Sequence, residues 1–90
     1  MSPRILKDGD LIFWFHSYDA ARESRASVHV GKGTQNDALD AKIWLEPEVE
    51  IARYGRTLSV SDLRQALRTA NEHRAQLVEA WHVHRGRVQI

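Results

Sequence analysis

The sequence predicts an α+β fold in which a small antiparallel sheet of three to four strands packs on one long C-terminal amphipathic helix. Two patterns predict this class. Apolar and polar residues alternate in short runs through residues 3–54, as expected for half-buried strands. Apolar residues then recur every three or four positions from about residue 60 to residue 84, the period of an amphipathic helix. A chain of 90 residues holds one domain, here residues 1–90 with a short tail at 85–90.

Composition excludes several classes of site. The chain has no cysteine, which excludes disulfides, thiolate metal ligands and cysteine nucleophiles. It has no His-Glu-x-x-His motif and no glycine-rich phosphate loop, so we expect no metal site and no cofactor. No apolar run approaches the ~20 residues of a membrane span, and residues 1–10 lack the apolar core of a signal peptide. We therefore expect a cytoplasmic protein that does not enter a membrane.

The strands are bounded by turn residues. A tight turn at Gly9 separates candidate strands at 4–6 and 11–15, and further alternating segments lie at 27–30 and 40–45. Segments 18–24 and 34–37 have the small and polar composition of loops. Segment 49–54 fits either a further strand or a single helical turn, and the pattern does not decide between them.

The long helix has a clear start. Ser59 can cap the amide of Asp62 while the Asp62 carboxylate reaches back to the amide of Ser59. Gly86 is the expected end. A helix of this length spans ~37 Å, whereas a compact domain of this size is only about 30–35 Å across. We expect the end from His82 onward to project beyond the body or to pack on a partner. The apolar stripe consists of Leu63, Ala66, Leu67, Ala70, Leu77, Val78 and Trp81.

Alternation along the strands gives the sheet two different faces. One face is apolar and matches the helix stripe, so together they form the predicted core: Leu11, Phe13, Phe15, Val28, Val30, Ala41, Ile43 and Leu45. The opposite face mixes aromatic, basic and polar residues, and clusters of this kind often mark binding surfaces. Its candidate partner-binding residues are Trp14, His16, His29, Lys42 and Trp44. The alternative is that loops or a second copy of the chain, as in a homodimer, cover the tryptophans.

Charge is distributed unevenly although the net charge is only +1. Residues 1–50 hold six Lys or Arg against nine Asp or Glu, and residues 51–90 hold seven Arg against three acids. Arginine binds phosphate bidentately, so the second half is a candidate nucleic-acid surface. The alternative is an ordinary solvated helix face. The residues of this candidate surface are Arg64, Arg68, Arg85 and Arg87.

His29 is the candidate catalytic residue. Histidine is the usual general acid or base near neutral pH, and Lys32 or Arg25 could hold a phosphate while the tryptophans stack bases. This combination describes a small ribonuclease. The alternative is a polar histidine with no catalytic role, and we expect a binding protein rather than an enzyme.

The order of these motifs resembles the family called domain of unknown function 4160, over about residues 3–86. The resemblance is carried by Pro3-Arg4-Ile5, Phe13-Trp14-Phe15, Val28-His29-Val30, the run Ala41-Lys42-Ile43-Trp44-Leu45-Glu46-Pro47, and Leu77-Val78-Glu79-Ala80-Trp81 at the end of the capped helix. The chain departs from the family pattern at Arg25 and Ala26, which replace a pair of prolines, and at Ser27, which replaces the first histidine of a His-x-His strand.

The resemblance implies a small bacterial protein encoded beside a second small protein, often of the domain of unknown function 2442 type. Such pairs are regarded as candidate toxin–antitoxin pairs, and the family brings no catalytic residues with it. Two functions therefore stand side by side. The first is an interaction module that binds a small protein partner, such as a gene neighbour, and in addition nucleic acid. The second is a toxin-like ribonuclease that uses His29.

Overall fold

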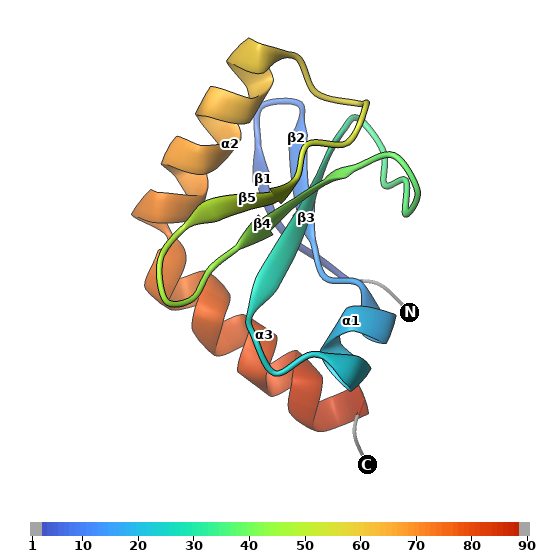
Figure 1. The fold of residues 1–90 in the computed structure, drawn as a ribbon, viewed down its shortest axis with the longest axis vertical. Coiled ribbons are helices and arrows are strands. Elements are labelled where there is room, and N and C mark those ends of the chain that lie inside the picture. Colours follow the sequence, from blue (N-terminus) through green and yellow to red (C-terminus); the bar gives the residue numbers. More distant parts are fainter. Residues whose placement is uncertain (1–2, 89–90) are drawn as a thin grey trace.

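A computed structural model describes residues 3–88 of the chain as a five-stranded antiparallel sheet with three helices. The strands follow one another across the sheet in the order β1-β2-β3-β4-β5 (Figure 1). The predicted α+β class is confirmed, but three to four strands was too few because segment 49–54 forms an edge strand. The elements are β1 (Arg4–Asp8), β2 (Leu11–Trp14), α1 (Ser17–Arg22), β3 (Ser27–Lys32), β4 (Ala41–Trp44), β5 (Glu50–Arg53), α2 (Val60–Glu72) and α3 (Arg74–Val88).

The core lies between one face of the sheet and the two C-terminal helices, as the two apolar patterns predict. Figure 1 shows α2 and α3 following one another along this side of the sheet, with α1 beside α3. The predicted apolar face is buried throughout. The core cluster consists of Leu11, Phe13, Phe15, Ala26, Val28, Val30, Ile43, Leu45, Ala66, Ala70, Leu77 and Trp81. No helix within residues 3–88 has the length and apolar character needed to cross a bilayer.

The prediction of a single long helix is wrong because the helix breaks at His73. The backbone leaves helical geometry there, and α3 begins at Arg74. The Arg74 side chain donates hydrogen bonds to the carbonyls of Leu45, at 2.7 Å, and Pro47, at 2.9 Å, on the segment between β4 and β5. These bonds hold the break against the sheet, so α3 follows the sheet instead of continuing the line of α2.

The expected projecting end is therefore also wrong for the residues that the structure describes. α3 packs beside α1, where the Arg85 Nε donates to the Glu23 carbonyl at 3.2 Å. Gly86 is not the end of the helix, because α3 continues to Val88. A glycine inside a helix costs only about 1 kcal/mol relative to alanine, so the surrounding turns are sufficient to carry the helix through it. The last two residues of the predicted tail, 89–90, lie outside the described residues.

Segment 18–24, predicted as a loop, contains the short helix α1 instead. His16 is its N-cap, and the ring Nδ1 accepts a hydrogen bond from the Tyr18 amide at 3.1 Å. Ala20 is buried beneath the helix. With only six residues and one buried position, α1 is too short to produce a visible apolar period.

Both edge strands carry a β-bulge. Between the pairs Arg4↔Trp14 and Leu6↔Phe13, strand β1 has one extra residue, which is Ile5. Ile5 and Leu6 consequently both pack against the core although they are adjacent in sequence. A second irregularity places Ala52 as the extra residue of β5. The hydrogen-bonding row of each edge strand is thus interrupted.

The predicted start of the C-terminal helix is confirmed in detail. Ser59 Oγ accepts from the Asp62 amide at 3.1 Å, and Asp62 Oδ2 accepts from the Ser59 amide at 3.1 Å. The backbone hydrogen bond from Ser59 lowers the pKa of the Asp62 carboxyl, against a smaller opposing effect of burial, and Lys32 adds to the lowering. The acidic N-terminal turn also suits the positive end of the helix dipole.

Candidate functional site

The five predicted partner-binding residues lie together on the face of the sheet opposite the core. Trp14 is paired with His29 across β2 and β3, and His29 with Lys42 across β3 and β4. The rings of Trp14 and His29 stack with centroids 4.7 Å apart, and the His16 ring lies 5.7 Å from each. The Lys42 ammonium lies 4.6 Å from the Trp44 ring centre. We call Trp14, His16, His29, Lys42 and Trp44 the aromatic–basic cluster.

Two members of the aromatic–basic cluster are covered, whereas His16, Lys42 and Trp44 stay partly exposed. Trp14 is 0% exposed and His29 is 3% exposed. Asp19 of α1 places its Oδ2 atom 2.7 Å from His29 Nε2 and 3.4 Å from Lys42 Nζ, and Glu23 Oε1 lies 2.7 Å from Lys42 Nζ. For Trp14 and His29 the alternative of a covering segment holds, because the segment containing α1 lies over them.

The loop before β4 contributes a buried carboxylate to the same face. Asp40 Oδ2 accepts hydrogen bonds from the Trp14 indole at 2.9 Å and the Asn36 amide at 2.9 Å. Its Oδ1 accepts from the Thr57 hydroxyl at 2.9 Å. A Cβ atom at position 31 would overlap the Asp40 carboxylate, so Gly31 provides the space that this carboxylate occupies.

One ring nitrogen of His29 has no hydrogen-bond partner among the described residues. The Nε2 atom faces the Asp19 carboxylate and donates its proton to this contact, whereas Nδ1 has no partner among the described residues. A buried polar atom without a partner costs about 1–3 kcal/mol. With the segment containing α1 lying over His29, part of the hydrogen-bonding capacity of His29 therefore remains unused. Within residues 3–88, no three His, Asp or Glu side chains form a group suited to a metal ion.

Lys32 does not belong with His29. It is paired with Leu11 and lies three residues along β3 from His29, so its side chain is on the other face of the sheet. Its Nζ atom lies 3.2 Å from Asp62 Oδ2 at the start of α2. The predicted combination of His29 as catalyst and Lys32 as phosphate ligand is therefore wrong. Arg25, the other phosphate candidate, is closer to the aromatic–basic cluster, with its guanidinium 4.3 Å from the Trp44 ring centre.

The four arginines predicted to bind nucleic acid do not form one surface. Arg64 and Arg68 are exposed on α2. Arg85 is engaged with Glu23, and its guanidinium lies 5.7 Å from the Trp81 ring centre. Arg87 lines a groove on α3. The four arginines were predicted as one surface from composition alone, but they lie on two helices that the break at His73 separates.

Asp19 makes the stability of the covered site depend on pH. Burial alone would raise the pKa of the Asp19 carboxyl, but the hydrogen bond with His29 and the charge of Lys42 hold the pKa below its ordinary value of 3.8. The folded state therefore binds this proton less readily than the unfolded chain does. Its contribution to the free energy of unfolding is complete above pH 3.8 and is lost as pH falls through the lowered folded-state pKa.

We therefore expect Asp19→Asn to be less stable than the wild type at neutral pH, with the difference shrinking below about pH 3.8. Urea unfolding at a series of pH values measures this difference. Asp10→Asn, at an exposed turn position, is the matched control and should show no such convergence. A difference for Asp19→Asn that widens towards low pH would contradict the assigned role of Asp19.

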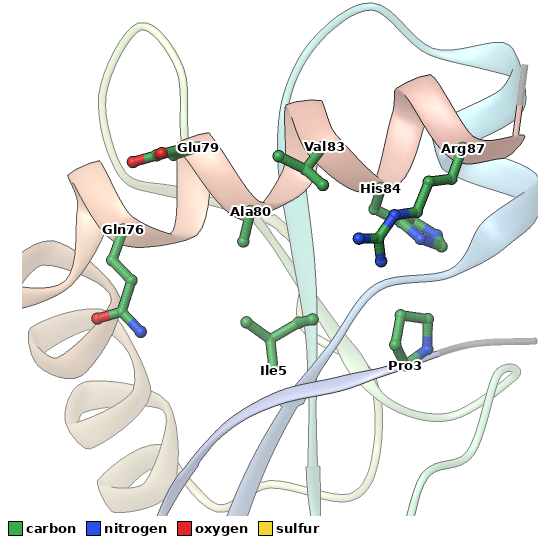
Figure 2. A pocket seen from close by; sticks show the side chains of 8 residues that line it. All are labelled: Pro3, Ile5, Gln76, Glu79, Ala80, Val83, His84 and Arg87. Atoms are coloured by element: carbon green, nitrogen blue, oxygen red, sulfur yellow. The ribbon is translucent and has the colours of Figure 1, made fainter.

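An open groove separates the edge strand β1 from α3 (Figure 2). It has a volume of about 400 Å³, and Val83, which is 50% exposed, lies on its α3 side. Burial lowers the pKa of the His84 imidazole, and Arg87 lowers it further, so His84 is neutral at pH 7. No local sequence pattern predicts this groove, because its two walls are far apart in the chain. The lining residues are Pro3, Ile5, Gln76, Glu79, Ala80, Val83, His84 and Arg87.

Comparison with known proteins shows to which family the chain belongs. The family model described as domain of unknown function DUF4160 matches residues 11–82. The chain belongs to the DUF4160 family. The matched segment of this DUF4160 protein extends from the start of β2 into α3 and includes the whole aromatic–basic cluster. No curated protein and no solved structure matches the chain.

Proposed function

We propose that this DUF4160 protein is an interaction module that binds a small protein partner, as one member of a two-protein, toxin–antitoxin-like pair. The observation that carries the proposal is the open groove between β1 and α3, which combines an apolar floor with charged ends. Since α1 covers the aromatic–basic cluster, the groove is the more accessible of the two candidate surfaces.

The shape of the groove favours an amphipathic helix of the partner. The lining residues of α3 run from Gln76 to Arg87, which corresponds to about 16 Å at 1.5 Å per residue, or three helical turns. The small side chain of Ala80 near the centre allows a second helix to approach closely. A partner strand would have to pair with β1, but the bulge at Ile5 interrupts that edge.

Charge at the two ends of the groove indicates how such a helix would be oriented. Glu79 lies towards one end and Arg87 towards the other, two turns along the same helix (Figure 2). A complementary helix would carry a basic residue opposite Glu79 and an acidic residue opposite Arg87, with apolar residues between them over Ile5 and Val83. Such charges fix orientation and register more than they add affinity.

We expect Val83→Glu to weaken partner binding more than tenfold, because a charged side chain would be buried without a partner at the centre of the contact. The measurement is co-purification of the tagged chain with a small protein encoded beside it, as the proposal requires, after nuclease treatment, followed by titration of the purified components. Val60→Glu is the matched control, since Val60 is 66% exposed on α2 and away from the groove.

The possible outcomes test the interaction function separately from the groove as its contact surface. A stoichiometric complex that survives Val60→Glu and is lost in Val83→Glu supports both the interaction function and the groove as the contact. A complex that Val83→Glu leaves unchanged contradicts the groove as the contact. If the wild-type proteins form no complex at all, the interaction function itself is contradicted.

A further inference from the structure

We propose that the sheet face beneath α1 is a binding site for single-stranded nucleic acid, which the chain closes with two of its own carboxylates. This inference concerns a different surface from the groove and does not depend on the protein partner. It rests on the chemistry of the aromatic–basic cluster, on the acids that cover it and on how weakly α1 is anchored.

The sheet supplies basic side chains and aromatic rings, and the segment containing α1 supplies carboxylates. His29 and Lys42 project from neighbouring strands, and the cationic groups of Lys42 and Arg25 are 4.6 Å and 4.3 Å from the Trp44 ring centre. Against them lie Asp19 and Glu23. The covering carboxylates thus occupy the positions that an external anion would take.

A phosphodiester strand has the chemistry to replace these carboxylates. Its anionic oxygens can accept the hydrogen bonds that His29 Nε2 and Lys42 Nζ now give to Asp19 and Glu23. An unpaired base beside that phosphate can stack on the half-buried Trp44 ring, as bases do on aromatic platforms in proteins that bind single strands. A duplex keeps its bases paired and stacked, so it cannot make the second contact.

The anchoring of α1 allows such an exchange. The helix has six residues, and Ala20 is its one buried side chain. Helices this short are not stable without tertiary contacts. Polar contacts also hold it, among them the Asp19 contacts with His29 and Lys42, the Ser17 hydroxyl 3.5 Å from His84 Nε2 and the Glu23 carbonyl that accepts from Arg85. Segments held by few apolar contacts open at low free-energy cost.

The unpartnered His29 Nδ1 is an independent indication of a ligand. It belongs to a side chain that is 4% exposed, and none of the described residues donates to it. A bound strand would bring hydroxyl groups, which can either donate to this atom or accept from it. Closure by α1 does not supply one.

The test is fluorescence anisotropy with short labelled single strands of RNA and of DNA, on the full chain. The double variant Asp19→Asn, Glu23→Gln removes both covering charges with little change of shape. We expect it to bind at least tenfold more tightly than the wild type. Asp10→Asn with Glu48→Gln removes the same charge from exposed positions and should tighten binding less than twofold. Adding Lys42→Met to the Asp19, Glu23 variant should abolish the gain.

Each outcome decides the proposal. Equal tightening by the Asp10, Glu48 control would reduce the effect to net charge and overturn the site. A folded Asp19, Glu23 variant that binds no better than the wild type would overturn it as well. If that variant does not fold, Glu23→Gln alone must still tighten binding, because it removes one of the two carboxylates at Lys42 and leaves the Asp19–His29 contact intact. Equal affinity for duplex and single strand would refute the stacking contact. Preference between RNA and DNA identifies the kind of strand.

Discussion

Replacing Trp81 with alanine should lower the free energy of unfolding by about 3–5 kcal/mol. Trp81 is 1% exposed and lies in the core cluster, where α3 covers the apolar face of the sheet. Truncation would remove its contacts and leave a cavity that the surrounding strands cannot close, because five paired strands hold their spacing. This is the largest single contribution that we expect from a side chain of α3.

Urea unfolding followed by circular dichroism measures the loss in the Trp81→Ala variant. Val83→Ala is the matched control, since it shortens a half-exposed side chain on the same helix and should change stability by less than about 0.5 kcal/mol. A loss below about 1 kcal/mol for Trp81→Ala would show that α3 is not packed on the sheet as described, and would remove the support for the groove that α3 forms with β1.

Replacing Asp40 with alanine should cost about 3 kcal/mol or more, although the change deletes only a carboxylate. The Trp14 indole, the Asn36 amide and the Thr57 hydroxyl would lose their common acceptor. Each buried donor left without a partner costs about 1–3 kcal/mol, and the hydroxyl alone can turn to another acceptor. The expected loss is therefore dominated by Trp14 and Asn36.

Thermal and urea unfolding of Asp40→Ala test this expectation, with Asp10→Ala as an exposed control of the same chemical change. The Trp14 indole also provides a local readout, because the nitrogen-bound proton of the ring should exchange faster with solvent once Asp40 is gone. Unchanged stability together with unchanged exchange would mean that Asp40 does not hold the loop before β4 in place.

The sequence patterns were sufficient for the core but not for its edges. Alternation identified the buried face from Leu11 to Leu45, and the stripe through Trp81 identified its cover, because both reflect burial that repeats along an element. No repeating sequence pattern predicts the break at His73. It depends on Arg74 reaching two carbonyls that lie some thirty positions earlier in the chain, and no local pattern carries that information.

The sequence pattern predicted which residues share the face of the candidate site, but not the acidic residues that cover them. Strand parity brought Trp14, His29 and Lys42 onto one face, as observed. The same parity already placed Lys32 on the other face, so the proposed His29–Lys32 combination could have been rejected from spacing alone. The acids of the α1 segment were not recognised as part of the site, because Asp19 and Glu23 reach it through a helix whose existence depends on tertiary contacts.

The order of the elements has a consequence for how the chain is made. Each of the five strands pairs with the strand that follows it in the sequence, so pairing can begin as each strand leaves the ribosome. Among the described residues, the apolar face they create is covered by α2 and α3, which are synthesised after the strands. Until those helices emerge, the nascent sheet exposes the surface that will become the core, and this interval is when the chain most needs protection from aggregation.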